Sequence, residues 1–270
     1  MGRTEYPMTA QIFTSDNPDA PIQEIIAIKS DSNTDPLTHF VPPLGYPEII
    51  FYLGNKQQIR NTTCTNGFIK GQYNIAQKID FTPEYHFLSL KLHPFGLKQL
   101  FNFSAVDLLN AVMDIEEHPV TVTLLEQIQN SRNIDIAFIK QFLYTVEQLK
   151  VYPISNATKE FIKAVKGTEK NTIKHIIKDM GIGLRTIQRN FKNEVGLTPK
   201  EFLRIIRMKK IEHQLTKTTN VSQIIADFDF TDQSHLVKEF KLLRNYTPNE
   251  LIKKKLLLSD QLPEPEFIPL

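Results

Sequence analysis

Residues 191–202, FKNEVGLTPKEF, follow the same pattern as residues 240–251, FKLLRNYTPNEL. In both segments a Phe-Lys pair precedes Gly196 or Asn245, and a Thr-Pro-x-Glu sequence comes next. Gly and Asn enter the left-handed conformation most readily, so these two positions predict the end of a helix. A Thr cap, a Pro at the first helical position and a Glu at the third predict a new helix directly afterwards. Each segment therefore predicts the end of one helix and the start of the next.

The repeat extends upstream of both segments. Apolar residues recur there at offsets 0, 3, 4 and 7, which is the spacing of one helix face. They are Ile173, Ile176, Ile177 and Met180 in the first copy and Val221, Ile224, Ile225 and Phe228 in the second. A predicted turn follows at Gly181 or Asp229, and an i, i+4 apolar pair then indicates a second helix. Helix, tight turn and helix is the helix-turn-helix pattern, so the chain is predicted to contain two such units.

The segment between the two units predicts one continuous helix from Thr198 to about Thr216, because no Pro or Gly interrupts its helical spacing after Pro199. At about 1.5 Å per residue this helix would span roughly 28 Å. Successive major-groove faces on one side of B-DNA are roughly 34 Å apart. The helix could therefore hold two reading elements near the spacing that a duplex requires.

Charge is distributed unevenly along the chain. Residues 168–258 contain 18 Lys and Arg against 10 Asp and Glu, a net charge of +8, whereas residues 1–167 contain 14 against 17. A basic module on an acidic remainder indicates an anionic partner, with nucleic acid as the first candidate. A merely solvated, Lys-rich surface would give the same composition.

These segments resemble the DNA-binding domain of the AraC/XylS family of bacterial transcription regulators. The resemblance covers about residues 165–255 and includes the stretches RTIQRNFK and FTDQSH and the terminal Thr-Pro pair, in that order. In such domains the second helix of each unit enters the major groove. The resemblance therefore implies sequence-specific binding to double-stranded DNA.

Candidate DNA contacts lie on the second helix of each unit. With Ile187 and Phe191 facing the core, Arg185, Gln188 and Arg189 point outward, and Arg suits guanine as Gln suits adenine. The resemblance places base contacts at Arg185 and Arg189, with Gln188 nearby, and on the second unit at Gln233, Ser234 and Lys238. His235 is also presented there, although packing at the turn is its alternative role. Phosphate contacts are predicted for Thr186, Lys192, Arg204, Arg207 and Lys241.

The N-terminal part predicts a small antiparallel β domain. Short apolar or alternating runs at residues 24–28, 48–53 and 87–93 read as strands, separated by turn-rich segments. From about Ala105 the pattern becomes helical and continues through residues 134–149, as a core helix or a dimer face. The predicted fold class is therefore α+β: a β domain with a helical subdomain, and an all-α domain with two helix-turn-helix units joined by a long helix. The predicted domains are residues 1–155, residues 165–258 and an acidic, Pro-containing tail at 259–270.

The stretches PPLGYPEIIFYLG, GQYNIAQKI and FLSLKLHPFGLKQLF resemble an N-terminal domain found in some AraC-type regulators. The resemblance implies that this domain senses a small molecule or mediates dimerisation. For the aromatic residues Tyr46, Phe51 and Tyr52, sheet core is favoured over a pocket. Double-stranded DNA is the predicted partner, and RNA polymerase, a small-molecule effector and a second copy of the chain are further candidates.

Catalytic and metal sites are not predicted. His39, His86, His93 and His118 lack metal-ligand spacing, no cofactor motif occurs, and Cys64 is the single cysteine. One cysteine cannot form an intramolecular disulfide, and the start of the chain has no apolar run like that of a signal peptide. These features predict a cytoplasmic protein that is not inserted in a membrane.

The predicted function is therefore transcription regulation without enzymatic activity. One alternative is an enzyme that acts on a small molecule through its β domain and carries the basic helices as a regulatory module. Another is a helical packing module, in which Arg185 and Arg189 could be replaced without effect on duplex binding.

Overall fold

The computed structural model describes most of the chain, with short gaps. The described residues are 8–14, 21–30, 37–53, 57–59, 62–64, 66–81, 86–131, 133–167, 173–181, 183–218, 220–228, 230–254 and 266–269. They fold around two main hydrophobic cores. One core lies in the N-terminal sheet and its covering helices, and the other lies along the C-terminal helices.

Seven strands form the main sheet, in the order β10-β7-β4-β9-β2-β1-β11. Their bounds are β1 Met8–Thr14, β2 Ile22–Ser30, β4 Glu48–Tyr52, β7 Gly67–Lys70, β9 His86–Leu92, β10 Val112–Asp114 and β11 Glu266–Pro269. All neighbours are antiparallel except β1 and β11, which run parallel. The strands predicted at residues 24–28, 48–53 and 87–93 are confirmed as β2, β4 and β9.

Two further two-stranded sheets accompany the main sheet. The first joins β3, Leu37–Val41, to β8, Gln77–Phe81, and the second joins β5, Gln57–Ile59, to β6, Thr62–Cys64. The residue before β8, Ala76, donates its backbone N–H to the carbonyl of Leu242 over 3.1 Å. The start of β8 therefore contacts the C-terminal helices.

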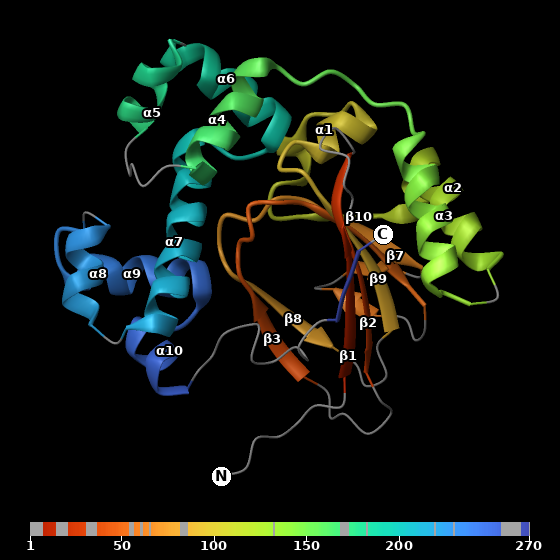
Figure 1. Ribbon diagram of the computed structural model, residues 1–270, viewed down its shortest axis with the longest axis horizontal. Coiled ribbons are helices and arrows are strands. Elements are labelled where there is room, and N and C mark those ends of the chain that lie inside the picture. The colour runs from red at the N-terminus through yellow and green to blue at the C-terminus, as the bar shows by residue number, and fades with distance from the viewer. Residues whose placement is uncertain are drawn as a thin grey trace.

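Helices cover the N-terminal sheet at one end and on one side (Figure 1). They are α1 Gly96–Phe101, the short 3-10 helices η1 Ala105–Leu108 and η2 Ile115–Glu117, α2 Pro119–Gln129 and α3 Ile136–Glu147. Helix α3 buries Ile139, Phe142 and Val146 in the N-terminal core, so the helical part of the predicted segment 134–149 is a core helix along that face.

The helical expectation was wrong for part of the segment after Ala105. Asn110 has a φ of +56°, which ends the helical turn, and Val112–Asp114 then pair with β7 as strand β10. Hydrogen bonding to a sheet edge stabilises an extended conformation there that local apolar spacing does not reveal.

The C-terminal part contains seven helices among the described residues. They are α4 Asn156–Gly167, α5 Ile173–Met180, α6 Leu184–Val195, α7 Pro199–Lys217, α8 Val221–Asp227, α9 Gln233–Arg244 and α10 Pro248–Lys254. The predicted continuous helix is confirmed as α7. Helices α5 and α6 lie at one end of α7, and α8 and α9 lie near the other (Figure 1).

Both copies of the repeated segment end and start helices as predicted. Gly196 has a φ of +86° and Asn245 a φ of +64°, and each ends a helix in the left-handed conformation. Thr198 and Glu201 then form a capping box, in which Glu201 N–H donates to Thr198 Oγ1 over 3.2 Å. The corresponding bond from Glu250 N–H to Thr247 Oγ1 is also 3.2 Å.

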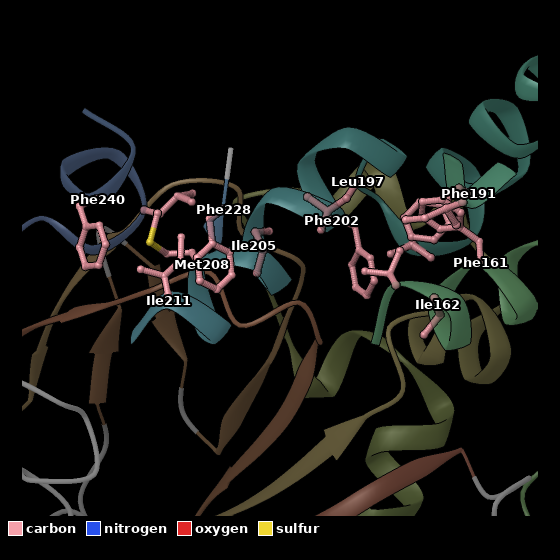
Figure 2. Close-up of a cluster of buried hydrophobic side chains, with 14 of the residues drawn as sticks. Phe161, Ile162, Phe191, Leu197, Phe202, Ile205, Met208, Ile211, Phe228 and Phe240 are labelled. Carbon is pink, nitrogen blue, oxygen red and sulfur yellow. The ribbon is translucent and has the colours of Figure 1, made fainter. Parts of the chain in front are cut away.

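The C-terminal core extends along α7 in two groups (Figure 2). Figure 2 shows Phe161 and Phe191 beside Phe202 at one end, and Phe228 and Phe240 beside Met208 and Ile211 at the other. The rings of Phe161 and Phe191 lie 5.1 Å apart, and those of Phe191 and Phe202 lie 5.3 Å apart, in edge-on contacts. Each helix-turn-helix unit is therefore packed on its own part of the same long helix.

Candidate nucleic-acid interface

The first helix-turn-helix unit consists of α5, the turn at Gly181 and α6. Gly181 has a φ of +65°, the conformation for which glycine was predicted there. Ile187 and Phe191 are fully buried, which fixes the rotation of α6 about its own axis. The side of α6 opposite these residues faces solvent.

That solvent-facing side carries the predicted base contacts. Arg185, Gln188, Arg189 and Lys192 are exposed at helical offsets 0, 3, 4 and 7, so they line one face of α6. Thr186 is exposed beside them. The structure thus brings all the candidate residues of the first unit to one surface, with three positive charges among them.

The second unit consists of α8, a turn and α9. Asn220 caps α8 by accepting from Gln223 N–H over 3.1 Å, and Asp232 caps α9 by accepting from His235 N–H over 2.8 Å. Leu236 and Phe240 are fully buried and fix the rotation of α9, as Ile187 and Phe191 do for α6. Asp229, at the predicted turn, lies outside the described residues.

The exposed side of α9 carries a second polar row. Ser234, Lys238 and Lys241 are exposed along it, with Gln233 and His235 on either side. The His235 ring also packs edge-on against Phe230, with centroids 5.1 Å apart. His235 is therefore exposed at one edge and packed at the turn on the other, and this ring contact agrees with its alternative, packing role.

Arg204 and Arg207 of α7 do not lie free on the surface. Arg207 Nη2 donates to Glu239 Oε2 over 2.9 Å, and Arg204 Nε lies 3.0 Å from Glu239 Oε1 as an ion pair. The guanidinium of Arg207 also lies 4.5 Å from the centroid of the Phe230 ring. Both arginines, predicted as phosphate contacts, join α7 to α9 instead of presenting an unpaired charge.

A second junction between α7 and α9 is more deeply buried. Arg244 is 1% exposed, and its Nε donates to Glu212 Oε1 over 2.6 Å. Tyr246 Oη donates to the same oxygen over 2.8 Å. A charge-assisted bond of this kind is expensive to break inside a protein, so α9 is held firmly against α7. No spacing rule in the sequence identifies Glu212 or Glu239, because each meets its partner only through the fold.

The N-terminal domain contacts both units. At the first unit, Ser155 donates its N–H to Glu194 Oε1 over 3.0 Å, and α6 ends against η1. At the start of α7, Asn74 Nδ2 donates to Glu201 Oε1 over 2.8 Å. At the second unit, Ala76 bonds to Leu242 as described above. The positions of α6 and α9 are therefore fixed by the β domain as well as by α7.

The metal-binding side chains and the single cysteine were considered as possible reactive sites in the part of the chain that the structure describes, and neither offers one. His, Cys, Asp and Glu side chains form no group of three or more there that could hold a metal ion. Cys64 is buried beside Phe68, and burial raises the pKa of its thiol to about 11, which disfavours the nucleophilic thiolate.

Comparisons with known proteins agree with this geometry. The helix-turn-helix domain family matches residues 176–254. The HTH-type transcriptional activator RhaS of Escherichia coli strain SE11 is 29% identical over 77 residues, and RhaS of strain K12 / DH10B is 31% identical over 71 residues. Residues 176–254 are therefore similar to the helix-turn-helix domain of these transcriptional activators. This match spans only about a quarter of each curated relative, 28% and 26% of their lengths.

The rest of the chain has less informative matches. Residues 17–114 match a family described as a domain of unknown function, DUF6597. A solved structure of ToxT from Vibrio cholerae covers 92% of this chain and 98% of its own, with 13% identity and a TM-score of 0.44.

Among the helices of the described ranges, none is both long enough and apolar enough to cross a membrane.

Proposed function

We propose that the protein is a sequence-specific DNA-binding regulator of transcription, which reads two successive major-groove segments through α6 and α9. The observation that carries this proposal is the pair of exposed, basic helix faces held near the two ends of α7. At about 1.5 Å per residue, the 19 residues of α7 span roughly 28 Å, close to one turn of B-DNA.

Base recognition is assigned to the exposed rows of the two helices. On α6 the readers are Arg185 and Arg189, with Gln188 between them, and each suits a bidentate contact with a purine. On α9 the readers are Gln233, Ser234 and Lys238, with His235 at the edge of the row. Thr186, Lys192 and Lys241 contact phosphates. Arg204 and Arg207 act through Glu239, by setting the orientation of α9.

The proposal also includes the role of the N-terminal domain, the location of the protein and its partners. The β domain senses a small molecule or mediates dimerisation, and the protein acts in the bacterial cytoplasm without catalysing a reaction. RNA polymerase and a second copy of the chain are candidate partners. The boundary between the N-terminal domain and the DNA-binding domain is proposed to lie between residues 155 and 165. Helix α4, which spans this segment, packs on the helical domain through Phe161 and Val165.

Fluorescence anisotropy tests the central claim. The full chain is titrated against duplexes from the DNA upstream of its own coding sequence, across a salt series. The test variant is Arg185→Ala, Arg189→Ala. The matched control is Lys29→Ala, Lys140→Ala, which removes the same charge from exposed positions of the N-terminal domain.

Site-selective binding that the test variant loses and the control keeps would support base readout by α6. Each lost bidentate contact is expected to cost about 1–3 kcal/mol of discrimination. Equal loss in both variants would reduce the interaction to nonspecific attraction between charges. Unchanged selectivity in the test variant would favour the packing-module alternative.

A further inference from the structure

Leu184, the first residue of α6, is an apolar side chain on an otherwise polar surface. It is 45% exposed, although leucine is usually buried in a folded domain. It belongs to neither of the two main hydrophobic cores of the described residues, and it does not pack against them. Packing within the described part of the chain therefore gives no reason for an apolar residue at this position.

The chain around Leu184 leaves its side chain open to a partner. The residue before it, Gly183, is the N-cap of α6 and has no side chain to cover the start of the helix. A Cβ added at Gly183 would meet only Thr186 Oγ1 among the described atoms, at 3.8 Å, and one added at Gly181 would meet none within 4 Å. The surface of another molecule can therefore approach the first turn of α6 closely.

The second helix-turn-helix unit indicates what this position contacts. Phe191 of α6 corresponds to Phe240 of α9, because each is the buried Phe of the repeated Phe-Lys pair. The same alignment matches Leu184 with Gln233, and each of these two residues is the first of its helix. Gln233 is a proposed base reader, and the N-terminal residues of a recognition helix contact base edges. Leu184 therefore lies where a base contact is expected, but it has no group that forms hydrogen bonds.

An alkyl side chain recognises one feature of the major groove, which is the C5-methyl group of thymine. Leu184 and Gln188 are four residues apart, so their side chains are neighbours on the same face of α6. Gln suits adenine, whose partner in the base pair is thymine. Contact between the leucine and a thymine methyl group would remove apolar surface of both from water, which is favourable.

We infer that Leu184 determines part of the sequence specificity by contacting the C5-methyl group of a thymine, beside the base that Gln188 reads. The second unit has Gln233 at this position, so the two units prefer different bases there and the complete site is asymmetric. This inference rests on the proposed function, because it requires α6 to lie in the major groove.

Deoxyuridine scanning provides the test, because deoxyuridine differs from thymidine only by the absence of the methyl group. Each thymine of a duplex that the full chain binds selectively is replaced in turn, and binding is measured by fluorescence anisotropy. The variants are Leu184→Ala, which shortens the side chain, and Leu184→Met, which keeps a long apolar one. The matched control is Ile136→Ala, because Ile136 is also the first residue of a 12-residue helix and is 46% exposed.

One thymine is expected at which deoxyuridine weakens binding by the native chain about four-fold, the effect of removing one buried methyl group. Leu184→Met and Ile136→Ala should show the same loss at that position. Leu184→Ala should bind the thymidine and deoxyuridine duplexes equally, because its side chain no longer reaches the methyl group.

The inference is overturned if no deoxyuridine substitution weakens binding by the native chain, or if Leu184→Ala distinguishes the two duplexes as the native chain does. Selective binding that is indifferent to every thymine methyl group overturns this inference alone and leaves the DNA-binding proposal standing. If the native chain binds no duplex selectively, both proposals fail.

Discussion

The guanidinium of Arg207 on α7 and the carboxylate of Glu239 on α9 are joined by a hydrogen bond of 2.9 Å. Since Arg204 pairs with the other oxygen of the same carboxylate, one acidic residue holds two cations of α7. Glu239 lies on the recognition helix, one residue after Lys238. The rotation of the exposed row of α9 is therefore coupled to α7 through a contact that lies outside that row.

Replacing Glu239 with Ala should weaken the second reading site more than the first. The change leaves two half-buried arginines without their acceptor and should lower the free energy of unfolding by roughly 1–3 kcal/mol. Urea unfolding gives the loss of stability, and anisotropy with duplexes altered in either half of the site gives the loss of discrimination. Glu160→Ala, at an exposed position of α4, is the control. An equal loss of discrimination in both halves would contradict the orienting role.

Gly196 and Gly181 should respond differently to substitution by Ala. Both have a positive φ, but an added Cβ at Gly196 would lie 2.6 Å from the carbonyl oxygen of Ala105, whereas none of the described atoms lies within 4 Å at Gly181. Gly181→Ala should cost about 1–2 kcal/mol for backbone strain alone. Gly196→Ala should cost clearly more, because the contact between α6 and η1 must also open. If the two variants had equal midpoints in thermal unfolding, the contact between α6 and η1 would accommodate the added methyl group without extra strain.

Asn74 should be energetically coupled to Glu201 but not to Glu250. Both glutamates close a capping box, yet only Glu201 also accepts from Asn74, over 2.8 Å. A double-mutant cycle of Asn74→Ala with Glu201→Gln should therefore give a coupling energy of about 0.5 kcal/mol or more. The parallel cycle with Glu250→Gln is the control and should give a value near zero. Equal coupling energies in the two cycles would mean that Asn74→Ala changes the stability of the whole fold and does not act specifically through Glu201.

The charge of Lys209 should make the free protein more stable at alkaline pH. The ammonium group of Lys209 loses its proton near pH 8 in the folded chain and near pH 10.5 in the unfolded chain. The charged side chain therefore lowers the free energy of unfolding below pH 8, and this effect disappears above about pH 10.5. Lys209→Met should accordingly raise the Tm at pH 7, by roughly 2–4 °C per kcal/mol regained, with a gain that shrinks as pH rises. The charged and titratable groups that face Lys209 are Tyr46, Lys70, Lys91, Lys166, Glu212 and Arg244. A gain independent of pH would point to packing, and not to charge, as its cause.

Lys192 and Lys241 should affect affinity without affecting sequence preference. Each lysine is exposed about one helical turn after the last predicted base contact of its helix, Arg189 or Lys238. A phosphate contact is expected at that position. Replacement of either with Ala should lower the slope of log affinity against log salt by about 0.9, for one released counter-ion. The ranking of duplex sequences should stay the same. A changed ranking would instead place the lysine among the base readers.

Local sequence patterns predicted the C-terminal fold well because its signals are short-range. Caps, helix stops and the apolar spacing of α5 to α9 depend on residues within a few positions of one another, and Gly196, Asn245 and both Thr caps were correctly assigned. The three strongest strands were also found, because their apolar runs are continuous or alternate regularly.

Features that depend on contacts between distant segments could not be predicted in this way. The sheet order, the pairing of Val112–Asp114 with β7, and the bonds of Arg204 and Arg207 to Glu239 all join residues far apart in the chain. Tyr46 illustrates the same limit. It was interpreted as sheet core together with Phe51, which is fully buried, but the fold places Tyr46 between lysines of two domains.

The parallel pairing of β1 with β11 has a consequence for the order of folding. Residues 266–269 complete a sheet whose first strand is residues 8–14, so its last edge can form only after the intervening helices have been synthesised. During synthesis on the ribosome, α4 to α10 can therefore pack before the β domain has all of its strands. The final step of folding would then be the addition of a strand to an exposed edge, and until that step β1 remains available for pairing with other chains.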